Sequence, residues 1–179
     1  METITKKISK TYEVLKDELG LTNPMQSPRV EKIVVSVGIG SVKDKNKVGL
    51  IADRLEKITG QKAAPRGAKK SIATFKTRQG DVVGYQVTLR GRRAETFLEK
   101  LINIALPRTR DFRGVSRSAI DAVGNYTLGI REHTIFPETS DEELRDVFGI
   151  AVTIVASGKN PTHTSRFLEY LGMPFTKIV

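Results

Sequence analysis

Positive charge is concentrated in one middle segment of this 179-residue chain, and this pattern is the strongest constraint on its fold and function. Between Gln61 and Arg117 lie 14 Lys or Arg residues and four acidic residues, a surplus of ten. The whole chain has 30 basic and 20 acidic residues, so the remainder is neutral, with 16 of each. Charge this segregated marks a binding surface rather than a general solubility device, and it predicts a polyanionic partner.

The composition is that of an ordinary globular protein, at 39% apolar and 28% charged residues. The length suits a single domain over residues 1–179 with a core of its own. A basic chain can bind nucleic acid or an anionic membrane, but we expect no membrane partner because no apolar run approaches the roughly 20 residues that span a bilayer. The chain begins without the apolar stretch of a secretory signal and has no cysteine, which is compatible with the cytoplasm.

Apolar residues at helical spacing and alternating β-branched residues divide the chain into helices and strands. Helices are expected over residues 3–19, 48–58, 94–105 and 160–171. Strands are expected over residues 29–37, 63–66, 85–90, 126–130 and 150–154. Helices mixed with strands that stand too close together for repeated crossovers predict an α+β fold, a mostly antiparallel sheet with helices packed on one face.

Several local features refine this expectation. The strand 29–37 is expected to be central, and the strand 63–66 to lie at an edge because Pro65 cannot donate to a neighbour. Residues 67–84 are basic and poorly periodic, so they are expected to form a long loop that projects from the sheet.

The remaining signals concern where helices begin and end. Pro107 is expected to stop the third helix, and the charged stretch 108–114 to form a loop. Ser140 and Glu143 have the spacing of a capping box and predict a short acidic helix.

No arrangement of residues points to catalysis or to a cofactor. Gly158-Lys159 lacks the rest of a phosphate-binding loop, and Gly38-Ile39-Gly40 has no third glycine at dinucleotide spacing. His133 and His163 have no cysteine partners for a zinc site. The acids at 141–143 and 146 are more typical of a solvated helix start than of a metal cluster. We therefore predict no enzyme, no cofactor, no metal and no small-molecule substrate.

The basic segment also holds aromatic residues among its cations, which is the mixture that binds unpaired RNA. Phe75 stands near Lys69, Lys70, Lys76 and Arg78, and Phe112 stands between Arg110 and Arg113. The alternative for Phe75 is that it fills a core position, the usual state of that residue. For Phe112 the sequence favours neither interpretation.

Long motifs in these regions resemble the bacterial type of large-subunit ribosomal protein five. The motifs are MQSPRVEKIVVSVGIG (25–40), AKKSIATFKTRQG (68–80), VTLRG (87–91), LPRTRDFRGVS (106–116), GNYTLGIREHTIFPE (124–138) and LGMPF (171–175). The resemblance covers nearly the entire chain. It implies a non-enzymatic protein of the central protuberance that binds 5S rRNA, contacts P-site tRNA, and bridges to a protein of the small-subunit head. Neighbouring large-subunit rRNA and proteins are also implied as partners.

The same resemblance assigns residues to these contacts. For 5S rRNA it implies Lys32, Ser36, Gln61, Phe75 and Thr88, to which the basic segment adds Lys69, Lys70 and Arg90. For P-site tRNA it implies the loop from Ser71 to Asp81, with Ser71, Thr74, Lys76 and Arg78 as the contacting residues. For the intersubunit bridge it implies Arg108, Arg110, Asp111, Phe112 and Arg113, together with the acidic turn after Phe136.

The chain also departs from the family pattern. Ser36 stands where the family commonly has Asn, which predicts a weaker or water-mediated contact. Residues 120–123 lack a usual cation, and residues 148–151 lack the usual Arg and Asp. Two other classes of function are kept as alternatives: an RNA-processing enzyme, which would need a clustered acid–base or metal set, and a peripheral membrane protein, which would need an exposed apolar face beside the cations.

Overall fold

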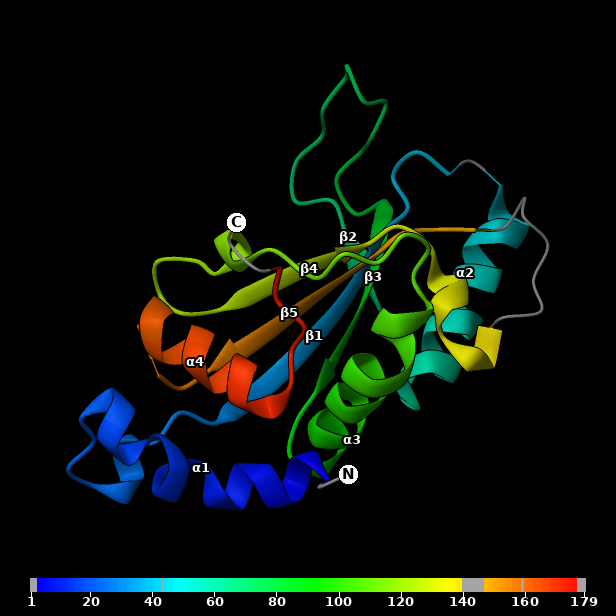
Figure 1. The fold of residues 1–179 in the computed structure, drawn as a ribbon. Helices are drawn as coiled ribbons and strands as arrows, with labels where there is room; N and C mark the ends of the chain where they lie inside the picture. The colour runs from blue at the N-terminus through cyan, green and yellow to red at the C-terminus, as the bar shows by residue number, and fades with distance from the viewer. Residues whose placement is uncertain (1–2, 43, 140–146, 159, 177–179) are drawn as a thin grey trace. The chain divides into compact units, whose positions relative to one another are not determined.

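The computed structural model describes residues 3–42, 44–139, 147–158 and 160–176 (Figure 1). In this part of the chain there are four α-helices and five strands. The helices are α1 (Ile4–Leu19), α2 (Lys45–Thr59), α3 (Arg92–Lys100) and α4 (Pro161–Leu171). The strands are β1 (Val30–Gly38), β2 (Ala64–Gly67), β3 (Val82–Leu89), β4 (Tyr126–Ile130) and β5 (Ile150–Ala156). The predicted α+β class is confirmed.

The five strands form one sheet in the order β2-β3-β1-β5-β4. Neighbouring strands run antiparallel, as their ends show. The Ser157 amide, just after β5, donates to the Arg29 carbonyl just before β1 at 3.0 Å, and the Ile39 amide, just after β1, donates to the Val83 carbonyl of β3 at 2.9 Å. The predicted central place of the first strand and the predicted edge place of the strand with Pro65 are both confirmed.

Strand β1 shows why the sheet has one covered and one open face. Ile33, Val35 and Val37 are buried, while alternate residues from Lys32 to Ser36 are only partly covered. A strand turns successive side chains to opposite faces, so the β-branched set packs under helices and the other set faces outward. The open face of β1 therefore carries Lys32, Val34 and Ser36.

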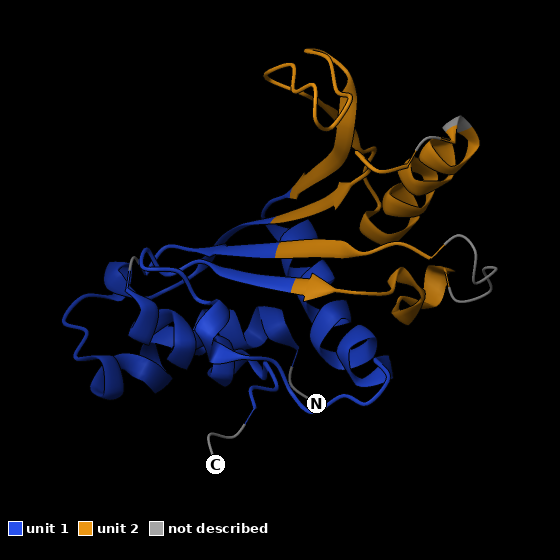
Figure 2. Cartoon of the chain, turned by 90° about the horizontal axis from the view of Figure 1, so that it is seen from above, with its two compact units in different colours: residues 1–33, 89–128, 153–179 blue, residues 34–88, 129–152 orange. Residues whose placement is uncertain are grey.

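Contacts between residues divide the chain into two compact units (Figure 2). Unit 1 comprises residues 1–33, 89–128 and 153–179, and unit 2 comprises residues 34–88 and 129–152. In unit 1, α1 packs against α3 and α4, and in unit 2 α2 packs against the short turn Pro137–Thr139. The expectation of a single domain over residues 1–179 stays a prediction.

Left-handed glycines end three of the four helices in the described part of the chain. Gly20, Gly60 and Gly172 have φ values of 62°, 67° and 105°. Glycine adopts this conformation without the steric penalty of a Cβ atom.

The third helix differs from its prediction. The α-helix ends at Lys100, and the chain continues through a π-helical turn, Leu101–Ala105, into a 3-10 turn, Leu106–Arg108. Pro107 lies within that last turn instead of stopping the helix before it. Proline is tolerated there because the first residues of a turn need no amide donor. The predicted acidic helix at Ser140 and the acids at 141–143 and 146 lie outside the described residues.

Candidate nucleic-acid interface

Strands β2 and β3 and the loop between them form a long hairpin, residues 64–89, which we call the basic hairpin. Ala64 pairs with Gln86 and Arg66 with Gly84 in antiparallel register. Arg66 Nε donates to Gln86 Oε1 at 2.6 Å, so these two side chains hold each other on one side of the hairpin. Figure 1 shows the loop leaving the end of β2 and returning to the start of β3.

The loop of the basic hairpin is closed by its own hydrogen bonds. At its base the Ala68 amide donates to the Asp81 carbonyl at 2.8 Å, and the Gly80 amide donates back to the Ala68 carbonyl at 3.0 Å. Further out, Ile72 and Thr77 exchange two backbone bonds of 3.0 and 3.3 Å. The sequence predicts a loop here but not this ladder, because the bonds join residues whose spacing follows no helical or strand period.

Two side chains complete the loop. The Asp81 carboxylate accepts from the Arg78 amide at 2.7 Å, and Ser71 Oγ accepts from the Gln79 amide at 2.9 Å. Asp81 is the only acid in the hairpin, and it is used to shape the turn. Ser71 was assigned to the tRNA contact, and in the free chain it also holds the loop together.

The tip of the basic hairpin exposes an aromatic ring. The Lys76 amide donates to the Ala73 carbonyl at 3.0 Å, and Lys76 has φ 52°, so the chain reverses over Ala73–Lys76. The Phe75 side chain is 72% exposed, and Ile72 behind it is 45% exposed. The alternative in which Phe75 fills a core position is wrong, because no described element covers the tip.

The loop that carries this exposed ring also carries four cations. Lys69, Lys70, Lys76 and Arg78 are all exposed, and Thr74 beside Phe75 is exposed as well. Within the described part of the chain these four cations make no ion pair. Their charge is therefore available to a ligand, and no pairing has to be broken to use it.

The other unit 2 residues assigned to 5S rRNA lie on or beside the open face of the sheet. Ser36 on β1 and Thr88 on β3 are half-buried, and Gln61 Nε2 donates to the Thr88 carbonyl at 3.4 Å. Gly84 lets β1 and β3 come together, since a Cβ atom placed there would lie 2.8 Å from the Val37 carbonyl oxygen. The structure therefore brings Ser36, Gln61 and Thr88 onto neighbouring strands and the adjoining turn.

Unit 1 carries the remaining predicted residues. Lys32 lies four residues before Ser36 on the open face of β1, and Arg90 is exposed just after β3. The stretch from Arg108 to Arg113 is the predicted charged loop. Asp111 has φ 50°, Phe112 is half-buried, and Arg108, Arg110 and Arg113 are exposed.

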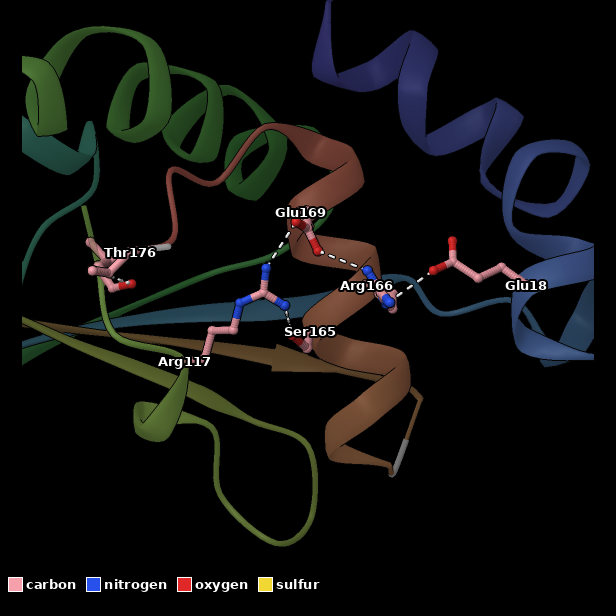
Figure 3. A network of polar contacts seen from close by, with 7 residues as sticks. Glu18, Arg117, Ser165, Arg166, Glu169 and Thr176 are labelled. Atoms are coloured by element: carbon pink, nitrogen blue, oxygen red, sulfur yellow. Dashed lines mark hydrogen bonds and ion pairs between the residues drawn. The ribbon is translucent and has the colours of Figure 1, made fainter. Parts of the chain in front are cut away.

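One cation of the basic segment has a structural use instead. Arg117 donates to Glu169 Oε1 at 2.8 Å and to Ser165 Oγ at 3.3 Å (Figure 3). Its guanidinium also lies 5.1 Å from the centre of the Phe175 ring. Arg166 extends the network to Glu18 of α1 at 3.0 Å. Arg117 therefore ties the segment before β4 to α4, and its charge is compensated within the protein.

Two features of the basic hairpin were not predicted from the sequence. Arg66 and Gln86 form a bonded pair on the hairpin, and Ile72 adds an exposed apolar side chain behind Phe75. The strand alternation of Gln86 and Thr88 was a usable signal for the first. Nothing local distinguishes Ile72 from a core residue.

The two histidines and the acids were also considered as ligands or catalytic groups. The described residues contain no group of three or more His, Asp or Glu side chains placed to hold a metal ion. His133 is buried, its ring stacks on Phe148 at 4.0 Å, and its Nδ1 accepts from the Phe148 amide at 3.3 Å. His133 is thus a packed core residue. None of the helices within the described ranges is both long and apolar enough to cross a bilayer.

An α+β fold with an open sheet face and a cationic hairpin that exposes an aromatic tip defines a structural protein suited to nucleic acid. Comparison with known families identifies it further. Residues 23–78 match the family model described as ribosomal protein L5, and residues 82–175 match the model that describes the C-terminus of the same ribosomal family.

Curated relatives agree with the family models. The chain is 51% identical over 164 residues to the large ribosomal subunit protein uL5 of Desulfotalea psychrophila, covering 91% of this chain and 92% of the relative. It is 48% identical over 163 residues to uL5 of Natranaerobius thermophilus, covering 90% and 91%. It is 46% identical over 164 residues to uL5 of Sulfurimonas denitrificans, covering 91% of each.

The chain belongs to the ribosomal protein L5 family. It is a structural constituent of the large ribosomal subunit, not an enzyme, and it acts in the ribosome, in the cytoplasm. Ribosomal RNA and other ribosomal proteins are its partners.

Proposed function

We propose that the chain binds 5S rRNA and helps to attach it in the central protuberance, using the basic hairpin together with the open face of β1 and β3. The observation that carries this proposal is the tip of the hairpin. Phe75 is 72% exposed, and its loop also carries four cations that have no ion-pair partner in the described chain. A free aromatic ring beside free cations can stack on an unpaired base and neutralise its phosphates.

The hairpin and the sheet face contribute in different ways. Lys69 and Lys70 supply phosphate contacts, and such contacts position an RNA without reading its sequence. Ser36, Thr88 and Gln61 supply short polar groups on a flat surface, which suits hydrogen bonding to ribose hydroxyls and base edges. The Arg66–Gln86 pair adds a fixed cation at the edge of the sheet.

A P-site tRNA contact is the second part of the proposal. It falls on the loop from Ser71 to Asp81, with Thr74, Lys76 and Arg78 as the contacting side chains. Support comes from the exposure of all three and from the internal bonds that fix the loop. Ser71 Oγ already accepts one amide, which leaves its hydroxyl proton and one lone pair for a ligand.

The intersubunit bridge is the third part, and we assign it to Arg108–Arg113. Three exposed arginines and one exposed acid in a tight loop suit a partner protein with charges of both signs. Asp111 in the left-handed region turns this loop sharply. Phe112 is half-buried, so it supports the loop and offers only one part of its ring to a partner.

The 5S rRNA proposal is tested by filter binding with purified 5S rRNA and the Phe75→Ala variant. We expect a loss of about 1–3 kcal/mol, or roughly five- to 150-fold in Kd, if the ring stacks on a base. Val82→Ala is the matched control, because it removes an exposed aliphatic side chain from β3 of the same hairpin without removing a ring. Its Kd should change by less than about threefold.

Two further measurements, of protein stability and of the salt dependence of binding, distinguish a lost RNA contact from a loss of folding. Both variants should keep the urea midpoint of the wild type, because Phe75 and Val82 are exposed at 72% and 46%. With about six to ten phosphate contacts, affinity should fall roughly 10³- to 10⁵-fold between about 50 and 200 mM salt. An affinity for 5S rRNA that is independent of salt, or a Phe75→Ala variant that binds as well as the wild type, would contradict the proposal.

A further inference from the structure

Unit 1 contains a pocket that the basic hairpin does not share. It lies between the end of α1, the short 3-10 turn Pro24–Gln26 and the loop that joins β5 to α4, and its volume is about 450 Å³. That volume is within the range of pockets that hold small organic ligands. Its lining includes Leu19, Leu21, Met25, Arg29, Ser157 and His163.

The main chain on one side of this pocket is held by a pair of hydrogen bonds. The Arg29 amide donates to Ser157 Oγ at 3.0 Å, and the Ser157 amide donates to the Arg29 carbonyl at 3.0 Å. The guanidinium of Arg29 takes part in neither bond and is exposed. The Arg29 main chain is therefore held in place, and its charged side chain lies at the pocket.

The turn on the opposite side is equally constrained. Gln26 Oε1 accepts from the Thr22 amide at 3.1 Å, the Thr22 hydroxyl at 3.2 Å and the Asn23 amide at 3.3 Å. Asn23 Oδ1 accepts from the Met25 amide at 2.9 Å. These bonds present Met25, whose side chain is 82% exposed, the highest exposed fraction among the large apolar side chains that the structure describes.

The lining offers a cation and a side-chain amide and no carboxylate, while Ser157 and His163 can each donate or accept a hydrogen bond. Gln26 Oε1 is occupied by three donors, which leaves the amide NH₂ of that side chain for a ligand, and Ser157 Oγ already accepts one amide. Arg29 adds a guanidinium, and no Asp or Glu lines the pocket. A ligand that matches it carries negative charge and hydrogen-bond acceptors, together with an apolar surface for Met25 and Leu21.

We propose that this pocket binds one unstacked nucleotide of ribosomal RNA, with its phosphate at Arg29 and its base against Met25. A nucleotide combines an anion, an acceptor-rich edge and a flat aromatic face, and methionine sulfur makes favourable contacts with aromatic rings. The other occupant with suitable charge is an acidic peptide, but it supplies a flat ring for Met25 only where it also carries an aromatic side chain. This is a second RNA contact in unit 1, and it does not depend on the 5S rRNA proposal for the hairpin.

The test uses the full-length, ¹⁵N-labelled chain titrated with adenosine and uridine 5′-monophosphates in separate experiments. We expect amide shifts at Met25, Arg29 and Gly158, with a dissociation constant in the millimolar range. Arg29→Ala should weaken binding about tenfold, as expected for a lost charge-assisted hydrogen bond. Met25→Ala should weaken it about threefold.

Both variants should remain folded. The bonds to Ser157 use only the main chain of Arg29, and the Met25 side chain is exposed. Val14→Ala is the matched control on α1, since Val14 is exposed at 54% and lies outside the pocket lining. Its affinity for both nucleotides should equal that of the wild type.

Several results would overturn the proposal. Inorganic phosphate that gives the same shifts with the same affinity would mean a simple anion site. A glutamate-rich peptide that binds the pocket more tightly than either nucleotide would make it a protein-docking site. Phe75→Ala separates the two proposals, because it should weaken 5S rRNA binding and leave the nucleotide-induced shifts at Met25 and Gly158 unchanged.

Discussion

Replacing Tyr126 by phenylalanine should stabilise the protein, which is the reverse of the usual effect of a core substitution. Tyr126 begins β4 and is fully buried, and its ring meets Phe175 edge-on at 5.8 Å. Its hydroxyl oxygen has no hydrogen-bond partner within the described residues. A buried hydroxyl without a partner costs about 1–3 kcal/mol of desolvation. Tyr126→Phe removes that cost and keeps the ring, so we expect a gain of about 0.5–2 kcal/mol in the free energy of unfolding.

The effect should grow at high pH. Burial raises the pKa of Tyr126 to about 12, from 10.0 for a free tyrosine. Between these two pKa values the unfolded chain loses its phenolic proton while the folded chain keeps it, so the wild type loses stability as the pH rises through this range. Below about pH 10 both states keep the proton, and the wild type has its full stability with respect to this group. At pH 11 this adds up to about 1.4 kcal/mol to the advantage of Tyr126→Phe.

Tyr170→Phe is the matched control, because that hydroxyl has a partner. Tyr170 Oη donates to the Lys7 carbonyl at 3.2 Å, so its removal should cost about 1 kcal/mol. The assay is urea unfolding of both variants and the wild type at pH 7 and pH 11. A Tyr126→Phe variant that is destabilised by about 1 kcal/mol or more, with no change between the two pH values, would refute the reasoning, since it would require a bonded hydroxyl.

Two further substitutions follow from local geometry. Gly84→Ala should destabilise the fold by about 1–3 kcal/mol, because a Cβ atom would lie 2.8 Å from the Val37 carbonyl oxygen. Gly49→Ala in α2 should stabilise the fold by up to about 1 kcal/mol, since nothing lies within 4 Å of its Cβ. Equal midpoints for the two variants in urea unfolding would contradict this. Arg117→Ala should lower the free energy of unfolding by about 1–2 kcal/mol, because it removes the bonds to Glu169 and Ser165 and the contact with Phe175. Arg166→Ala should lower it by less than about 1 kcal/mol, because the ion pair of Arg166 with Glu18 is more exposed. Thermal unfolding that ranks them in the opposite order would show that the Phe175 contact contributes nothing.

Much of the fold could be predicted because the sequence encodes it locally. The alternation around Ile33, Val35 and Val37 identifies β1, and its richness in β-branched residues indicates a central strand. Gly20 and Gly60 mark helix ends, because few residues other than glycine adopt the conformation found there. Strand order was not predictable, since strand pairing depends on contacts between segments far apart in the chain.

The candidate site was predictable in composition but not in geometry. The cations and Phe75 are visible as a local mixture, yet the exposure of Phe75 depends on what other elements fail to cover it. Arg117 illustrates the opposite error. It counts toward the basic segment, but its guanidinium pairs with Glu169, which lies 52 residues away in sequence. Charge counting cannot distinguish a free cation from one that is paired across the fold.

The internal bonds of the basic hairpin also affect how tightly an RNA could be held. Fixing the backbone of a flexible residue costs roughly 1–2 kcal/mol, so a loop that became ordered only on binding would lose much of its contact energy. Here the bonds of Ala68, Ile72 and Asp81 fix the loop before any ligand arrives. Pre-ordering also keeps Phe75 in water at 72% exposure, a cost that the free protein carries and that stacking on a base would relieve. Weakening the loop bonds should therefore reduce RNA affinity even where every cation and the ring are retained.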